Sequence, residues 1–124
     1  MKRDASPLRI ISGMTRHVIL IGGLAIKFPH VRNGAYFTVL GMLANMNERD
    51  LWKSYHHRCL AKVYWCAPFG LFLVMKRYRY YIPHFVPEGA LPFRGTENKP
   101  DSLAIEGGVV ILLDYGNNGV EIDA

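Results

Sequence analysis

Residues 8–28 read LRIISGMTRHVILIGGLAIKF, and this stretch decides the fold because it holds three short β-rich runs separated by two turns. The first turn contains Ser12-Gly13, which has ordinary turn chemistry. The second is Gly22-Gly23, which allows a two-residue reversal because glycine reaches positive φ without steric cost. The stretch therefore predicts an antiparallel meander. Its expected strands are 8–11, 16–21 and 24–28.

A helix is expected to follow the meander. The spacing of Phe37, Leu40 and Leu43 is helical and one-sided. Gly41 and the polar residues 45–50 lower the helix propensity. The sequence therefore predicts either one helix, or two with a break within that polar stretch and a second short helix beyond it.

The rest of the chain predicts two more hairpins and a loop. The hairpins are 60–64 with 70–76, and 102–105 with 109–113. Between them, residues 78–100 carry four prolines and scattered glycines, so regular structure should be sparse there. The sequence thus predicts a single α+β domain over residues 1–124, mainly antiparallel sheet with one or two helices and a proline-rich loop at 78–100.

Length and composition narrow the class of protein. A chain of 124 residues, half of them hydrophobic, suits one folded domain. Its longest apolar stretches are interrupted by glycine or proline and fall short of the roughly 20 residues that cross a bilayer, so no membrane span is expected. The two cysteines, Cys59 and Cys66, make no disulfide scaffold, and together with His56-His57 they lack zinc-site spacing. A cytoplasmic protein without a bound metal is expected.

Two short motifs, in order along the chain, suggest a family. Ala25-Ile26-Lys27 ends a strand, and a helix, two strands and a final hairpin then lead to Asp114-Tyr115-Gly116. This order resembles the protein-kinase-like superfamily, specifically a kinase N-lobe followed by the catalytic-loop and Asp-Phe-Gly hairpin. The resemblance implies that Lys27 would hold the α- and β-phosphates of ATP, and that Asp114 would hold magnesium.

The remaining kinase parts match less well. The resemblance places the helix glutamate that pairs with the lysine on Glu48, although an exposed helix-end acid is an equally good interpretation. It places the catalytic loop on residues 95–102, where Glu97 stands for the base aspartate. Residues 8–21 contain one glycine and therefore no Gly-x-Gly-x-x-Gly loop to close over phosphates. The chain also leaves no room for the long helices of a C-lobe.

These departures predict a degenerate, pseudokinase-like protein that is not an enzyme and needs no cofactor. The competing hypothesis is an ATP- and magnesium-dependent kinase in which Lys27, Glu97 and Asp114 act as phosphate anchor, base and metal ligand. That enzyme would need a second subunit to supply the C-lobe function.

One basic aromatic run is the candidate contact surface. Its residues are Lys76, Arg77, Tyr78, Arg79, Tyr80 and Tyr81. Alternating cations and aromatic rings can neutralise phosphates and stack bases, so a nucleic-acid-binding module is one alternative. The run also suits an acidic protein partner, and it is equally typical of a half-buried edge strand with a basic outer face. The formal charge of +5 permits either kind of partner and selects neither.

The favoured hypothesis is a non-catalytic binding or inhibitory protein that acts on a macromolecular partner. A protein is favoured over a nucleic acid as that partner. Small trimmed domains of this kind are typical of inhibitors carried by phages. An anti-defence role, such as anti-CRISPR activity or host takeover, enters only through that analogy.

Overall fold

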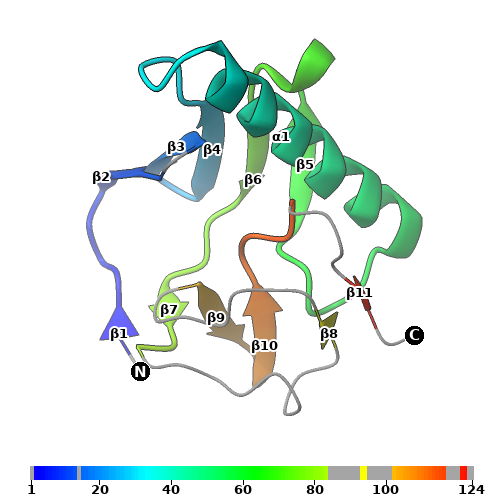
Figure 1. Ribbon diagram of the computed structural model, residues 1–124. Helices are drawn as coiled ribbons and strands as arrows, with labels where there is room; N and C mark the ends of the chain where they lie inside the picture. The colour runs from blue at the N-terminus through cyan, green and yellow to red at the C-terminus, as the bar shows by residue number, and fades with distance from the viewer. Residues whose placement is uncertain (1, 14, 84–92, 95–101, 117–120, 123–124) are drawn as a thin grey trace.

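The computed structural model describes residues 2–13, 15–83, 93–94, 102–116 and 121–122. These residues form one α-helix and antiparallel sheets, which is the expected α+β class (Figure 1). None of the described helices has the length and apolar character that a bilayer crossing requires.

The largest unit is a five-stranded antiparallel sheet in the order β2-β3-β4-β6-β5. Its strands are β2 (Leu8–Ser12), β3 (Arg16–Ile21), β4 (Leu24–Pro29), β5 (Val63–Cys66) and β6 (Leu73–Lys76). The meander predicted from residues 8–28 is confirmed, with Ile21 paired to Leu24 across the glycine turn. The next predicted hairpin is also confirmed as β5 and β6, which are joined by the short 3₁₀ helix η1 (Pro68–Gly70).

Helix α1 (Ala35–Tyr55) runs unbroken for 21 residues, so of the two alternatives the single helix is confirmed. The buried positions of α1 are Gly41, Ala44, Asn45 and Glu48, which recur at helical spacing on one face. Gly41 is required by close packing, since a Cβ there would lie 3.0 Å from the Cα of Pro29. Packing of this face against the sheet outweighs the weak propensity of the polar residues.

A second, smaller sheet has the order β1-β7-β9-β10. Its strands are β1 (Lys2–Arg3), β7 (Tyr80–Tyr81), β9 (Leu103–Glu106) and β10 (Val109–Leu112). The predicted hairpin at 102–113 is confirmed as β9 and β10. Strand β7 and strand β8 (Phe93–Arg94) lie within the segment expected to be a loop, and β8 pairs with β11 (Glu121–Ile122).

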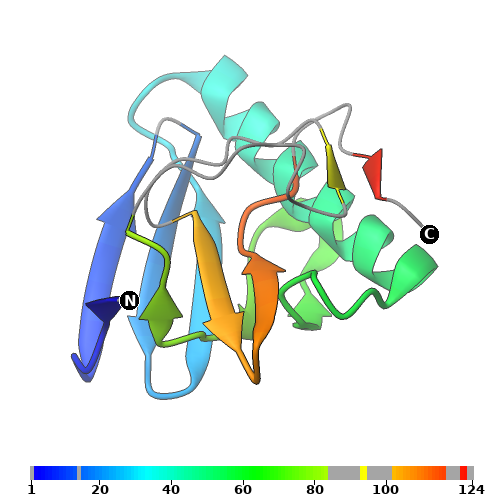
Figure 2. The same ribbon diagram turned by 90° about the horizontal axis from the view of Figure 1, so that it is seen from below.

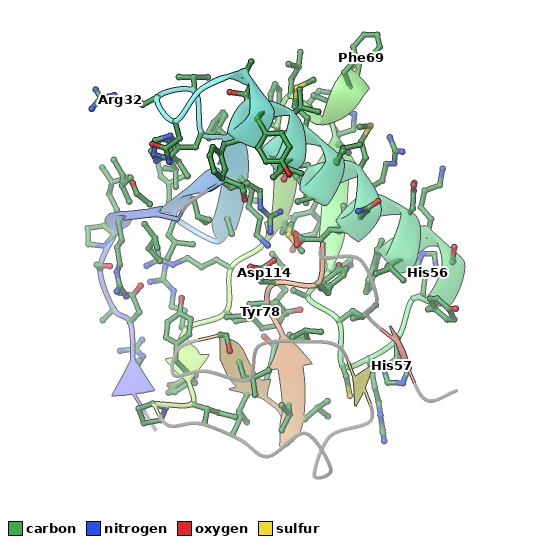
Figure 3. All side chains as sticks on the ribbon, in the orientation of Figure 1. Arg32, His56, His57, Phe69, Tyr78 and Asp114 are labelled. Atoms are coloured by element: carbon green, nitrogen blue, oxygen red, sulfur yellow. The ribbon has the colours of Figure 1, made fainter. Side chains whose placement is uncertain are left out.

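The core lies between the inner face of the five-stranded sheet and the β9–β10 hairpin (Figure 2). Leu73 and Met75 of β6 pack there with Leu103 and Leu112, and Tyr115 is buried beside them. The Tyr115 hydroxyl donates a hydrogen bond to the Ala61 carbonyl at 2.7 Å. This packing brings the segment after β10 beneath α1 and fixes the position of Asp114 (Figure 3).

Candidate functional site

Glu48 is the centre of a buried polar cluster. Its side chain has no exposed surface, so its interpretation as an exposed helix-end acid is wrong. Its Oε1 accepts a hydrogen bond from Lys27 Nζ at 2.6 Å. Its Oε2 accepts one from the Tyr115 backbone N–H at 3.1 Å. The structure therefore joins β4, α1 and the segment after β10 through one carboxylate.

Arg16 of β3 completes the cluster. Its Nη1 and Nη2 donate to the two oxygens of Glu48 at 3.0 and 2.9 Å, a paired geometry that fits a guanidinium to a carboxylate. The Nη2 atom also donates to Asp114 Oδ1. We call Arg16, Lys27, Glu48 and Asp114 the charge cluster. The sequence predicted three of its members as a nucleotide site and missed Arg16.

Asn45 holds the two cations in place. Its Oδ1 accepts from Arg16 Nη1 at 3.0 Å, and its Nδ2 donates to the carbonyls of Lys27 and Gly70 at 3.1 and 3.0 Å. Lys27 Nζ makes a second bond to the Leu113 carbonyl at 2.7 Å. A buried polar network with its members satisfied in this way is rigid.

The charges of the cluster shift the pKa values of Asp114, Lys27 and Arg16. The protein around Asp114 would on its own raise the pKa of this carboxyl, although its side chain also reaches solvent, but the positive charges of Lys27 and Arg16 outweigh that effect and lower it to about 2. Burial lowers the pKa of Lys27, and the negative charge of Glu48 opposes this. The carboxylates of Glu48 and Asp114 raise the pKa of Arg16, against the effect of its burial. The two cations offset the two carboxylates, so the cluster carries no net charge.

Only Asp114 opens the cluster to solvent. Its side chain is 56% exposed, whereas those of Arg16 and Lys27 are 8% exposed. Phosphoryl transfer needs a cation free to neutralise phosphates and a carboxylate free to hold a metal. Here the Asp114 carboxylate already has Arg16 as its partner of opposite charge, whereas the pairing of Lys27 with Glu48 is one that an active kinase also has. Within the described residues, no group of three or more His, Cys, Asp or Glu side chains is placed to hold a metal ion.

Glu97, the predicted base, lies outside the described residues, as do Lys99 and Pro100.

The basic aromatic run is not one exposed surface. Arg77, Tyr78 and Tyr81 are buried, which removes them from the predicted contact surface. Arg77 Nη2 donates to Asp4 Oδ2 at 2.9 Å, and the Tyr78 hydroxyl accepts from the Lys62 N–H at 3.2 Å. Half of the run is buried because it carries the chain from the five-stranded sheet to the second sheet, past the core that includes Tyr78.

The part that remains accessible is small. Tyr80 is 46% exposed, and Lys76 and Arg79 are half-buried. Arg79 donates to three backbone carbonyls, those of Asp4, Ser6 and Gly22, and none of these acceptors offsets its charge. An open hollow of about 460 Å³ lies beside these side chains. Its lining includes Arg3, Arg79, Tyr80 and the Gly107-Gly108 turn.

Comparisons with known proteins identify no relative: no family model matches the chain, and neither does any curated protein or solved structure.

Proposed function

We propose that this protein is a non-catalytic binding protein on a reduced protein-kinase-like scaffold, which inhibits or remodels a protein partner. The observation that carries the proposal is the charge cluster, in which Arg16 engages both carboxylates that a kinase would use. We also propose a cytoplasmic setting, which suits the two free cysteines, Cys59 and Cys66.

The scaffold part of the proposal is supported by the order of the elements and by one ion pair. Lys27 lies on β4, α1 follows it, and Asp114 comes directly after the β9–β10 hairpin. The Lys27–Glu48 pair joins a strand lysine to a helix glutamate, which is also the pairing that an active kinase requires. No single one of these features is specific, so the resemblance remains part of the proposal.

Nucleotide binding would disturb the charge cluster, which favours a protein without catalytic activity. Magnesium on Asp114 would compete with the Arg16 guanidinium for that carboxylate. If Arg16 were displaced from Asp114, its buried guanidinium would keep Glu48 as its one carboxylate partner. Buried charges that lose a partner are costly. The turn between β2 and β3 also lacks the glycine-rich backbone that grips phosphates.

The surface around Tyr80 is the proposed binding site for the protein partner. Arg3 lies with its guanidinium carbon 5.9 Å from the Tyr80 ring centroid, beside the charge of Arg79. Tyrosine and arginine in a hollow are typical of protein interface centres, and the positive charge suits an acidic side chain of the partner. A nucleic-acid-binding module is less favoured, because stacking successive bases needs successive exposed rings and Tyr78 and Tyr81 are buried.

One observation favours the alternative of an ATP- and magnesium-dependent kinase that needs a second subunit. The Lys27 and Glu48 atoms are 2.6 Å apart, as in a kinase ready to bind nucleotide. In that enzyme Lys27, Asp114 and Glu97 would be the phosphate anchor, metal ligand and base. The two functions differ in whether the isolated chain binds ATP with magnesium.

The substitution Tyr80→Ala tests the proposed contact surface. We expect it to weaken the complex with a partner captured from cells of the native host at least about tenfold, because exposed aromatic anchors carry much of the energy of an interface. The complex should persist at moderate salt. The measurement is a titration of the captured partner by biolayer interferometry.

Tyr36→Ala is the matched control, since Tyr36 is an exposed tyrosine on α1 and away from this hollow. It should leave the affinity unchanged. Equal affinity for wild type and Tyr80→Ala would refute this contact surface. Capture of nucleic acid with a steep loss of binding as salt rises would favour the nucleic-acid alternative instead.

A further inference from the structure

Among the described strands, β2 is an open edge of the five-stranded sheet. It pairs with β3 on one side and stands at the end of the strand order. Figures 1 and 2 both place it at the outer margin of the molecule. An edge strand presents a row of unpaired N–H and C=O groups that can pair with a strand of another molecule.

Two hydrogen bonds identify which backbone groups point outward. The Gly13 N–H donates to the Arg16 carbonyl at 2.8 Å, and the Gly22 N–H donates to the Pro7 carbonyl at 3.3 Å. Both lie in the register of the β2–β3 pair, where bonding and non-bonding pairs alternate. Residues 9 and 11 therefore bond to β3, whereas residues 8, 10 and 12 direct their N–H and C=O groups to the open edge.

The side chains of this edge are apolar and uncovered. Leu8 and Ile10 are 55% and 64% exposed, and Ile11 is also exposed. On the face that carries Leu8 and Ile10, Ile21 and Leu24 continue the exposed apolar surface onto β3 and β4. Proteins usually protect such an edge with lysine, proline or a bulge. Strand β2, with the sequence LRIIS, pairs without a bulge and contains neither residue.

We propose that two copies of this chain pair antiparallel through β2, about a two-fold axis at Ile10. In this register Ile10 lies opposite the second copy's Ile10, and Leu8 lies opposite the second copy's Ser12. All three positions have their backbone groups directed outward, so the joint forms regular backbone hydrogen bonds. The two sheets become one continuous sheet across both molecules.

The register favours a second copy as the occupant because the strand is complementary to itself, as a two-fold interface requires. Arg9, the one charged residue of β2, lies opposite the second copy's Ile11 and not opposite another arginine. Like charges directly opposite would destabilise the pair. The Asp4 carboxylate, whose Oδ2 lies 3.6 Å from Arg9 Nη1, also offsets part of the positive charge of Arg9.

The small size of the β2–β2 interface predicts a weak dimer. One five-residue strand per copy is much less than the roughly 20–30 residues a side of a stable interface. The formal charge of +5 on each copy adds repulsion, which salt reduces. The dimer should therefore form with rising concentration, and more readily at moderate than at low salt.

Sedimentation equilibrium and amide hydrogen exchange over about 10 to 500 µM protein test the proposal, a range that covers weak association. We expect a monomer–dimer equilibrium and slower exchange of the Leu8 and Ile10 amides as concentration rises. Ile10→Lys, which places two lysines opposite each other, should weaken the dimer at least tenfold. Val31→Lys is the matched control, because Val31 is an exposed apolar residue outside the sheet, and it should leave the dimer unchanged.

Ile10→Pro is a second variant that removes an outward N–H while keeping the bonds to β3, so it should also prevent pairing and leave the fold intact. A monomer at every concentration would overturn the proposal and would point to a strand of another protein or to no partner strand. A dimer that survives both Ile10 substitutions would overturn it as well, because its interface would then lie elsewhere.

Discussion

Glu48→Gln is expected to lower the free energy of unfolding by about 3–5 kcal/mol, the usual cost of removing one partner from a buried ion pair. Glutamine keeps the shape of the side chain but removes the charge that offsets both Arg16 and Lys27. Its amide nitrogen would also face a donor at one of the two oxygen positions, which accept from Arg16, Lys27 and the Tyr115 N–H. The measurement is urea denaturation followed by circular dichroism.

Glu106→Gln is the matched control. Glu106 pairs with Lys76 at the surface, with half of its side chain exposed. An exposed pair contributes about 1 kcal/mol or less, so this variant should unfold close to wild type. If Glu48→Gln were equally mild, the charge cluster would not be the buried, mutually dependent unit described above.

Arg77→Met is also expected to lower the free energy of unfolding by about 3–5 kcal/mol. This loss of stability should be seen in the isolated protein, without any partner. Methionine keeps the apolar stem but leaves the buried Asp4 carboxylate with only the more distant and more exposed Arg9 as a cation. Hydrogen bonds from Ser6 and the charge of Arg77 hold the pKa of Asp4 below its ordinary value. That carboxylate therefore stabilises the fold above about pH 4, and the stability is lost as pH falls further. Urea denaturation at pH 7 and at acid pH should show a smaller acid loss in the variant.

Arg49→Met serves as the control for Arg77, because Arg49 makes an ion pair with Asp50 at the surface of α1. It should change stability by less than about 1 kcal/mol. If Arg77→Met were as stable as wild type but no longer bound the partner, the burial of Arg77 would be contradicted. The whole basic aromatic run would then again be the candidate contact surface.

Local sequence chemistry was sufficient for most strands. The Gly22-Gly23 and Gly107-Gly108 turns fix two hairpins, because few other residues adopt the backbone of such turns without strain. The helix was harder to predict because propensity and packing disagree in it. Asn45 and Glu48 are polar, yet they fall on the buried face at the spacing set by Gly41. That spacing was the available signal, and it indicates a buried polar face and not a break.

The candidate site was predictable in part. Lys27 and Asp114 follow from the order of two motifs, and the structure brings both to Glu48. Arg16 carried no comparable signal, because its partners Glu48 and Asp114 are 32 and 98 residues away along the chain. The burial of Arg77 and Tyr78 was also hidden, since an alternating basic and aromatic run has the same pattern at a surface and at a crossing between two sheets.

Binding of ATP with magnesium to the isolated chain tests the central claim most directly, because a ligand that binds the folded state must stabilise it. Thermal unfolding is measured with magnesium and about 1 mM ATP, the upper end of ordinary Michaelis constants. The charge cluster predicts no rise in melting temperature, and none in Asp114→Asn. A saturable rise that Asp114→Asn abolishes would contradict the account, since the cluster would then open to nucleotide.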